Sequence, residues 1–364
     1  MPDALKDVYS ETFLENLGST ITQYDPAFKT TQLIQDTLTA DWPALKLMER
    51  RDKITWALHN QLPSDFKQAA EILCATSTTI TGLAALCLPN YVALYGRDDW
   101  QTSMTALGIM TKSSSAEFAI RPFLIDAPEE TIHQMRLWSK SANEDQRRLA
   151  SEGIRPRLPW GIRLKQFVDD PTPIFPILDN LINDASPYVQ KSVANNLNDI
   201  SKDHPQQVID YCQMHFNDSK TAQWVINRGL RTLFKAGNSD VLSLLGYSQD
   251  DAELVTHIAL TTPTSRVNLN QTTEFDYHLT NTTSDELPLY LGYRVHYVKK
   301  NQQTSPKDFF IKRVILKPHE TLTGRFAMTW KQLTTRTLYP GSHHIELLIN
   351  TVPVAAMDIE LMNG

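Results

Sequence analysis

Cysteine is scarce in this sequence. Only Cys74, Cys87 and Cys212 occur among 364 residues, and no two of them form a CxxC pair. Such a distribution argues against a disulfide scaffold or a thiolate zinc site and suits a reducing compartment. His215 lies near Cys212, but no second pair stands at metal-ligand spacing, so we expect no metal site.

Long apolar runs are missing too. The most apolar window, residues 80–95, is interrupted by Gly82 and Pro89 and is too short to span a bilayer. The first residues carry acids where a secretory signal needs basic residues and then an apolar stretch. We therefore expect a cytoplasmic protein with no membrane partner.

The common motifs of nucleotide and metal chemistry are also absent. The sequence has no Walker loop, no GxGxxG after a strand, no GxSxG and no HExxH. We therefore expect neither a cofactor nor a bound nucleotide. The chain is 41% hydrophobic and 21% charged, which excludes wholesale disorder, and its length allows two or three domains.

Most of the chain has helical apolar spacing, from about residue 4 to residue 247. Helix starts, each with a capping side chain before the first turn, are expected at residues 64–65, 126–129 and 186–187. Residues 149–153, 193–197 and 225–229 form a faint repeat, at offsets typical of stacked helical pairs. The repeat favours an α-solenoid, although periodicity alone supports a plain helical bundle equally well.

The remainder of the chain, from about residue 262, alternates in the manner of β-strands. Short runs of this kind lie at residues 275–279, 293–298, 310–315 and 344–349. They predict a small antiparallel sandwich. We place the boundary near residues 248–251, which gives one domain at 1–250 and a second at 251–364.

Residues 186–202 predict an amphipathic helix. Its apolar face holds Val189, Val193, Leu197 and Ile200, and its polar face holds Lys191, Asn195, Asn198 and Lys202, with Asp199 at the flank. The polar face is either a solvated outer surface or, for an inner helix of a solenoid, part of a concave lining.

Positive charge gathers in one segment of an acidic chain. The formal net charge is −6, yet residues 147–165 hold six basic residues against Glu152 alone. Such a local concentration can bind phosphates where the global charge cannot.

Candidate chemistry is limited to acids beside basic or aromatic residues. Glu117 is either a capping-box partner or a carboxylate facing a cleft, and Glu152 is either an ion-pair member or a site residue kept ionised by its cationic neighbours. Trp160 is either a core residue or, if exposed beside arginines, a stacking platform for a nucleobase.

Three segments resemble the AlkC-type DNA alkylation repair glycosylases, which are relatives of the AlkD type. They are SAEFAIRPF at residues 115–123, LASEGIRPRLPW at 149–160 and SVANNLNDISKDHP at 192–205, and PNYVALYG at 89–96 is similar to the same family. The segments cover roughly residues 40–240, and their occurrence together is far more specific than any one of them.

The resemblance implies a mainly α fold, a HEAT-like α-solenoid, followed by a small all-β immunoglobulin-like sandwich. It implies a cofactor-free, monofunctional glycosylase that removes cationic N-alkylated bases, such as 3-methyladenine and 3-methylcytosine, from duplex DNA. The catalytic acids of the family map onto Glu117, Glu152 and Asp199, with Trp160 as a neighbouring aromatic. Ala116 departs from the pattern, because we expect a polar residue there.

The partner expected from the resemblance and the local charge is double-stranded DNA, bound by a monomer. The side chains expected to contact it are Arg148, Arg155, Arg157, Trp160, Lys191, Asn195, Lys202, Arg228 and Arg231. A second hypothesis is a non-enzymatic HEAT-repeat scaffold for protein or DNA, since a fold does not imply an activity. It predicts that the three acids lie far apart or point into the core.

Overall fold

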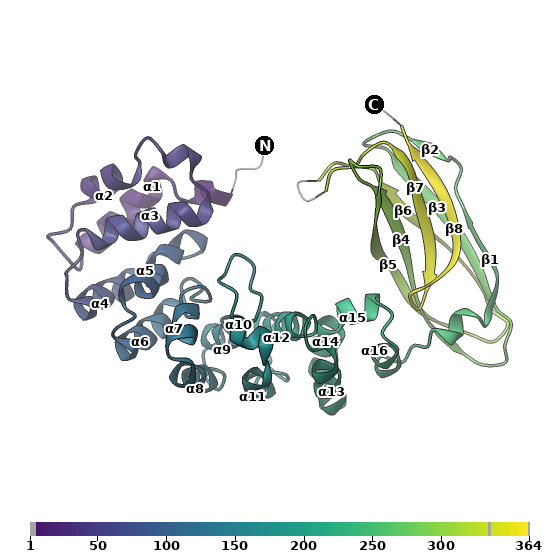
Figure 1. Ribbon diagram of the computed structural model, residues 1–364, viewed down its shortest axis with the longest axis horizontal. Helices are drawn as coiled ribbons and strands as arrows, with labels where there is room; N and C mark the ends of the chain where they lie inside the picture. The colour runs from purple at the N-terminus through teal and green to yellow at the C-terminus, as the bar shows by residue number, and fades with distance from the viewer. Residues whose placement is uncertain (1–4, 334–335, 363–364) are drawn as a thin grey trace. The chain divides into compact units, whose positions relative to one another are not determined.

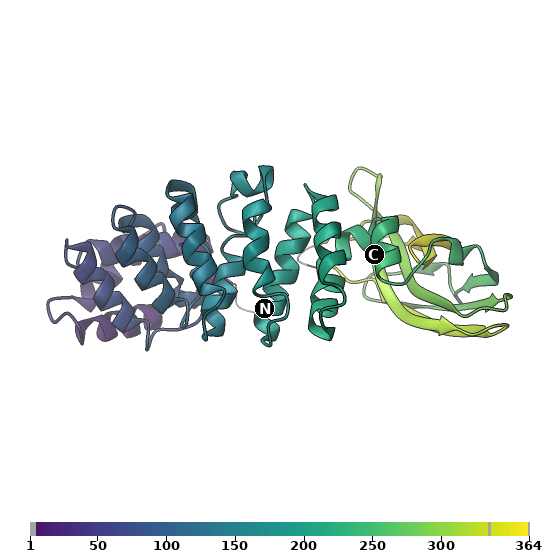
Figure 2. The same ribbon diagram turned by 90° about the horizontal axis from the view of Figure 1, so that it is seen from below.

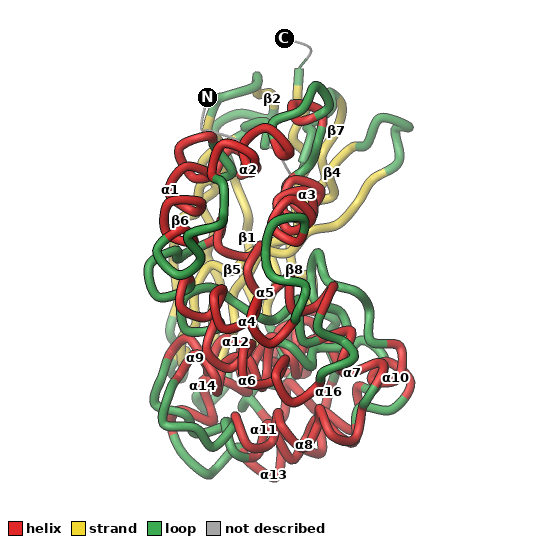
Figure 3. The backbone as a smooth tube through the Cα atoms, turned by 90° about the vertical axis from the view of Figure 1, so that its left-hand side faces the viewer, coloured by secondary structure: helices red, strands yellow, loops and turns green. Residues whose placement is uncertain are grey.

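The protein, described by a computed structural model over residues 5–333 and 336–362, divides into two compact units, Met1–Gly229 and Leu230–Gly364. The first unit is helical, and the second contains all the strands of the described residues (Figure 3). The mainly α fold with a β-sheet domain after it is therefore confirmed.

The first unit is built from short helices joined by turns and longer loops, and the helices lie side by side along it (Figure 2). Its α-helices are α1 (Glu11–Thr22), α2 (Thr30–Thr37), α3 (Leu47–His59), α4 (Phe66–Thr76), α5 (Cys87–Tyr95), α6 (Trp100–Met110), α7 (Arg121–Asp126), α8 (Pro128–Trp138), α9 (Glu144–Glu152), α10 (Lys165–Asp169), α11 (Phe175–Asp179), α12 (Pro187–Ile200), α13 (Pro205–His215) and α14 (Lys220–Gly229). Within the described residues, none of the helices has the length and apolar character needed to cross a membrane.

Two rows of helices form the part of this unit that carries the predicted site. Helices α9, α12 and α14 are neighbours, and α8, α11 and α13 lie along one side of them (Figure 1). The segments aligned as a repeat, residues 149–153, 193–197 and 225–229, fall on α9 and the turn after it, on α12 and on α14. The repeat thus relates neighbouring helices.

Two of the three expected helix caps are present. Asp65 accepts a hydrogen bond from the backbone N–H of Gln68 at the start of α4, and the Ser186 hydroxyl accepts one at the start of α12. Residue 126 was expected to cap α8, and this is wrong: the Asp126 carboxylate instead accepts a hydrogen bond from Nε of Arg97 at 2.6 Å. Helix α8 begins with Pro128, whose fixed φ suits a first turn.

The apolar face of α12 lies in the core of the first unit. Val189, Val193 and Leu197 are fully buried. Gly229 on α14 lies so close to Leu197 that a Cβ there would stand 3.1 Å from the Cβ of Leu197. The glycine on α14 therefore allows α14 and α12 to pack closely. Helix α9 is the other neighbour of α12 in this row.

The second unit is a two-layered β structure preceded by two short helices. Its elements are α15 (Arg231–Lys235), α16 (Ser239–Leu244), β1 (Val255–Thr261), β2 (Arg266–Val267), β3 (Thr272–Asn281), β4 (Leu287–Val298), β5 (Thr304–Leu316), β6 (Thr321–Thr329), β7 (Gly341–Ile349) and β8 (Val352–Leu361). One sheet has the order β1-β3-β6 and the other β2-β8-β7-β4-β5, and among the strands of the described residues only the β2/β8 pair is parallel. The four predicted strand segments lie in β3, β4, β5 and β7.

The two sheets share one core. The ring of Phe326 on β6 stacks on Tyr293 of β4, with centroids 4.4 Å apart. Trp330 is fully buried beside them and donates its indole N–H to the Thr273 hydroxyl at 2.9 Å. Side chains from the two inner faces interdigitate in this way to form the core of such a sandwich.

The boundary between the compact units falls before Leu230, earlier than the expected residues 248–251. The reason lies in the packing of the segment between the two positions. The ring of Phe234 on α15 contacts Tyr290 of β4, with centroids 4.7 Å apart, and Asn350 donates to the backbone carbonyl of Ser248 at 2.6 Å. Residues 230–250 are helical in large part but contact the sheets.

Replacing Leu197 by alanine should lower the free energy of unfolding by about 2–5 kcal/mol, because the close contact with α14 leaves a cavity that cannot collapse fully. Urea denaturation followed by circular dichroism measures the change. Leu94→Ala is the control, since Leu94 on α5 is 50% exposed and its loss should cost under about 0.5 kcal/mol. Equal effects of the two changes would contradict the assignment of α12 to the core.

Candidate active site

The three predicted acids come from three separate segments of the first unit. Glu117 lies in the turn before α7, Glu152 is the last residue of α9, and Asp199 lies in the last turn of α12. Glu117 does not cap a helix, because α7 begins only at Arg121. Ser115 accepts the backbone N–H of Glu117, which fixes the turn itself.

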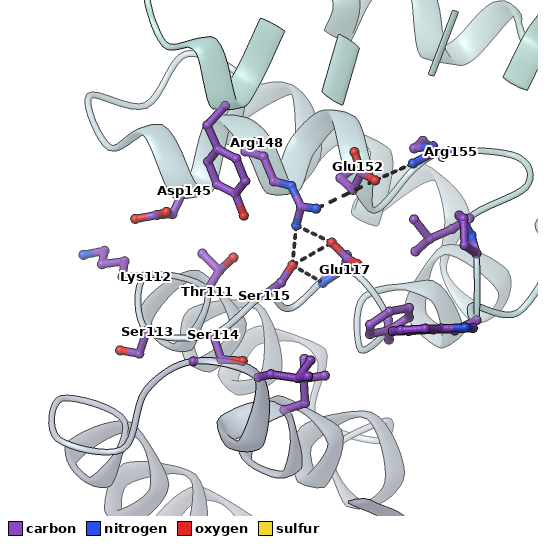
Figure 4. A pocket seen from close by; sticks show the side chains of 18 residues that line it. Thr111, Lys112, Ser113, Ser114, Ser115, Glu117, Asp145, Arg148, Glu152 and Arg155 are labelled. Carbon is purple, nitrogen blue, oxygen red and sulfur yellow. Dashed lines mark hydrogen bonds and ion pairs between the residues drawn. The ribbon is translucent and has the colours of Figure 1, made fainter. Parts of the chain in front are cut away.

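Arg148 on α9 joins two of these acids. Its Nη1 atom contacts the carboxylate of Glu117 and the hydroxyl of Ser115, and its Nη2 lies 3.7 Å from Oε1 of Glu152. Figure 4 shows Arg148 reaching across the gap between the two carboxylates. The Ser115 hydroxyl also donates to Oε2 of Glu117 at 2.9 Å.

Arg155, in the turn after α9, joins Glu152 to the third acid. Its Nη1 is 2.5 Å from Oε1 of Glu152, and its Nε is 2.8 Å from Oδ2 of Asp199. Lys202 completes the chain, with Nζ 2.9 Å from Oδ1 of Asp199. The structure therefore brings Glu117, Glu152 and Asp199 into one continuous network, which we call the acid network.

Ser192 forms a hydrogen bond with Glu152, and Ser151 lies next to Ser192. Ser192 on α12 donates to Oε2 of Glu152 at 2.6 Å, and its hydroxyl is also within hydrogen-bond distance of the Ser151 hydroxyl. Both oxygens of Glu152 are thus engaged, and so are both oxygens of Asp199. For Glu117, the contacts among the described residues use Oε2 only.

The basic partners offset the unfavourable burial of negative charge at the C-terminal ends of two helices. Glu152 and Asp199 stand at the C-terminal ends of helices, where the helix dipole disfavours negative charge. They are 5% and 2% exposed, so water screens them little. Burial by itself lowers the pKa of Arg155, but Glu152 and Asp199 outweigh it, and the pKa is raised above its ordinary value. Arg155 therefore stays charged between the two acids.

A pocket of about 520 Å³ opens beside the network. Glu117, Arg148 and Glu152 line it, together with Tyr188, whose ring lies 5.0 Å from the guanidinium carbon of Arg148. Burial raises the pKa of the Tyr188 hydroxyl. The pocket thus places ionised side chains and an aromatic face around one cavity.

Trp160 lies at the rim of this pocket and is not a core residue. It is 63% exposed and lines the cavity. Its φ of +64° lies in the left-handed region, which a bulky residue rarely adopts. Backbone strain of this kind persists only where the surroundings enforce it, and it is frequent at functional sites. The indole is held outward, where a ligand can reach it.

The residues predicted to contact DNA differ in how far their charges are already paired within the protein. Arg148 and Arg155 are committed to the acid network, and Arg157 forms a bidentate pair with Asp203 at 2.6 and 2.8 Å. Lys191 is exposed on α12, and Lys202 keeps 44% of its side chain exposed. Of the remaining residues, Asn195 lies on α12, Arg228 stacks over Trp224 on α14, and Arg231 begins α15, which belongs to the second unit.

Sequence reasoning missed three contributors to this region. Ser192 and Tyr188 lie on α12, where a polar or aromatic residue beside a helix start carries no distinctive signal. Arg121 was also missed, although an arginine inside the apolar run AIRPFLI is a sign of a buried, hydrogen-bonded guanidinium. Its side chain is fully buried. Among the described residues, His, Cys, Asp and Glu form no group of three or more that is arranged to hold a metal ion.

Comparisons with known proteins agree with this two-part organisation. Residues 108–233, which contain the acid network, match the family described as "DNA alkylation repair enzyme". Residues 256–363 match the family described as "Uncharacterised protein YhaZ, C-terminal Ig-like domain". The fold and site therefore define a DNA alkylation repair protein with an immunoglobulin-like domain after its helical unit.

Two relatives match over nearly the whole chain. The alkylpurine DNA glycosylase AlkC of Pseudomonas fluorescens, solved bound to DNA containing an abasic site analog, is 36% identical, covers 99% of this chain and 100% of its own, and superimposes with a TM-score of 0.93. YhaZ of Bacillus subtilis (strain 168) is 35% identical over 357 residues, which are 98% of this chain and 99% of YhaZ. The chain belongs to the AlkC-type family of DNA alkylation repair enzymes.

The pair of Arg157 and Asp203 predicts a pH dependence of stability. The hydrogen bond from Arg157 lowers the pKa of Asp203 below its ordinary value. A carboxyl with a lowered pKa stabilises the fold above its unfolded pKa, and this contribution is lost as the pH falls through the lowered value. At neutral pH, Arg157→Gln should therefore reduce the free energy of unfolding by about 0.2–1 kcal/mol.

Denaturation at a series of pH values tests this expectation. The difference between wild type and Arg157→Gln should vanish in acid, and Asp203→Asn should produce the same loss with no addition in the double variant. A difference that is constant from neutral to acid pH would mean that the ion pair is not its cause.

Proposed function

We propose that this protein is a monofunctional DNA glycosylase that excises cationic N-alkylated bases, such as 3-methyladenine and 3-methylcytosine, from duplex DNA. The observation that carries the proposal is the acid network: Glu117, Glu152 and Asp199, linked through Arg148 and Arg155 beside an open pocket with an exposed tryptophan at its rim. The Pseudomonas fluorescens relative, an alkylpurine DNA glycosylase, supports the same reaction.

The chemistry needs no cofactor. Alkylation at N3 gives the base a positive charge, so it is already an activated leaving group and requires little protonation. Its departure leaves positive charge on the deoxyribose, as in glycoside hydrolysis, and oriented carboxylates stabilise that charge. Water then attacks the sugar carbon with the help of a general base. An undamaged base has a stronger bond and gains less from the same carboxylates.

The contacts support different roles for the three acids. Glu152 and Asp199 are buried with both oxygens engaged, so they can supply fixed negative charge but little freedom to move. The described contacts of Glu117 use one oxygen only, and Glu117 lines the pocket. We assign the orientation of the attacking water to Glu117 and electrostatic stabilisation to the other two.

The arginines of the acid network set its charge. Three carboxylates are paired with Arg148, Arg155 and Lys202, so the network is formally neutral. Both alternatives that the sequence leaves open for Glu152 hold in part, since it is an ion-pair member and also lines the pocket. Stabilisation then depends on the orientation of the carboxylates toward the sugar, since pre-organised dipoles and ion pairs act without net charge.

Duplex DNA would lie across α9, α12 and α14, in a HEAT-like solenoid. Lys191 and Lys202 expose charge there for the phosphates, with Arg157 nearby and Asn195 and Arg228 on the same helices. Trp160 presents its ring at the rim for stacking against a base or sugar. We propose that the protein acts as a monomer in the cytoplasm.

The scaffold hypothesis expected the three acids to be far apart or directed into the core. Their linkage through two guanidinium groups supports the enzyme instead. Ion pairs that are costly to bury and that lie beside an open pocket are the arrangement that a site acting on developing charge needs.

Glu117→Gln should fold normally and lower the rate of base release by about a hundredfold or more, because general bases contribute on that order. Glu152→Gln and Asp199→Asn should lower it similarly while retaining DNA binding. Incubation with methylated DNA and chromatography of the released bases measures the rate. Glu71→Gln, at an exposed position on α4, is the matched control and should leave it unchanged.

No release of 3-methyladenine or 3-methylcytosine by the wild type above the rate in buffer would refute the proposed function. If all three acid variants and the control are fully active, the proposed reaction still holds, but the catalytic roles assigned to the three acids are wrong.

Affinity for undamaged duplex DNA should fall steeply with salt, because each phosphate contact releases counterions. Lys191→Gln should reduce the slope of log K against log salt by about 1. Fluorescence anisotropy of labelled duplexes measures both quantities. Lys140→Gln is the control, since Lys140 follows α8 in the other row of helices. The slope of log K against log salt for this variant should equal that of the wild type. Equal slopes in Lys191→Gln and wild type would place the DNA elsewhere.

A further inference from the structure

Arg121, the first residue of α7, is a fully buried arginine without an acid as its direct partner among the described contacts. It donates to three backbone carbonyls instead. Nε donates to Ile162 at 2.5 Å, and Nη1 donates to Gly153 at 2.8 Å and to Arg155 at 2.9 Å. All three acceptors belong to the segment 153–162, which connects the end of α9 to the pocket rim.

The free-energy cost of burying this guanidinium indicates a role beyond filling space. Nη2 of Arg121 is buried and has no hydrogen-bond partner among the described residues. An unpaired buried donor on a charged group is expensive, and an apolar side chain of similar volume would avoid the expense. Burial lowers the pKa of Arg121 to about 10, and the charge of Arg155 contributes in the same direction.

The segment 153–162 is shaped to receive this guanidinium. A Cβ on Gly161 would stand 3.3 Å from both Cδ and Nε of Arg121, and 3.1 Å from Leu158. A Cβ on Gly153 would stand 2.6 Å from Ile120, the residue before Arg121. Glycine at both positions allows the backbone to approach α7 closely enough for the three hydrogen bonds.

The same segment carries two groups of the proposed site. Arg155 bridges Glu152 and Asp199, and its own carbonyl is one of the acceptors of Arg121. Trp160 stands at the pocket rim with a left-handed backbone that its surroundings must enforce. The bonds of Arg121 to residues 155 and 162 enclose Trp160 on both sides in the sequence.

We propose that Arg121 is a positioning residue of the active site: its guanidinium fixes the segment 153–162, and thereby sets Arg155 between the two acids and Trp160 at the rim. The part of the proposal that concerns catalysis rests on the proposed function. A planar guanidinium reaches separate carbonyls in fixed directions, whereas the single ammonium of a lysine cannot. The role therefore requires arginine and not positive charge alone.

Hydrogen–deuterium exchange of the full-length protein tests the structural part of this proposal. Arg121→Lys should raise exchange about tenfold or more in peptides covering residues 153–162, with other helices of the first unit unchanged. Arg50→Lys is the matched control. Arg50 on α3 is also buried and donates to a backbone carbonyl, that of Lys6. The substitution Arg50→Lys should therefore destabilise α3 without affecting residues 153–162.

Single-turnover base release tests the catalytic part. Arg121→Lys should lower the rate constant at saturating enzyme by up to about a hundredfold, because small misplacements of reacting groups have that effect. The affinity for undamaged DNA should change less than about threefold, since phosphate contacts on α12 remain. Arg50→Lys should retain the wild-type rate. A merely structural role would lower the active fraction and leave the rate constant of folded enzyme unchanged.

Gly161→Ala provides a second variant if Arg121→Lys does not fold. It keeps Arg121 but inserts a methyl group against it, so exchange in residues 153–162 should rise and the rate constant should fall in the same direction. Unchanged exchange and an unchanged rate in the folded variants would overturn the proposal. If the wild type releases no base, the proposed function fails, and exchange alone then decides whether Arg121 fixes the segment.

Discussion

The buried pairing of carboxylates with guanidinium groups is the interaction on which the rest of this site depends. Glu152 and Asp199 are drawn from the ends of different helices into a region with little water, which is tolerable only because Arg155 lies between them. The pairing fixes α9 against α12 at the same time as it orients the acids. Stability and the proposed chemistry therefore share the same contacts.

The packing of the first unit provides the frame for this pairing. Glycines and small residues allow α7, the segment 153–162 and α14 to approach their neighbours closely. Ser192 on α12 donates to the remaining oxygen of Glu152, and the hydroxyl of Ser151 on α9 is within hydrogen-bond distance of Ser192. The pocket that results is polar on the side of the network and aromatic at Trp160 and Tyr188, a combination suited to a charged, planar base beside a sugar.

Periodicity predicted the class of fold because it reports which side chains are buried, and Val189, Val193 and Leu197 are buried as expected. The strand segments followed from alternation in the same way. Other features depend on contacts between residues far apart in the chain. The carboxylate of Asp126 is taken by Arg97, and residues 230–250 are helical yet contact β-strands. The three acids came from resemblance, while the links through Arg148 and Arg155, and the support by Ser192 and Arg121, required the structure.

Three neighbouring carboxylates would normally attract a divalent cation such as magnesium, which is abundant in cells and prefers oxygen ligands. Here two guanidinium groups and one ammonium group already occupy at least one oxygen of each carboxylate. A tethered arginine cannot diffuse away or be stripped by a chelator. The protein thereby holds its carboxylates oriented and paired with cations that belong to its own chain.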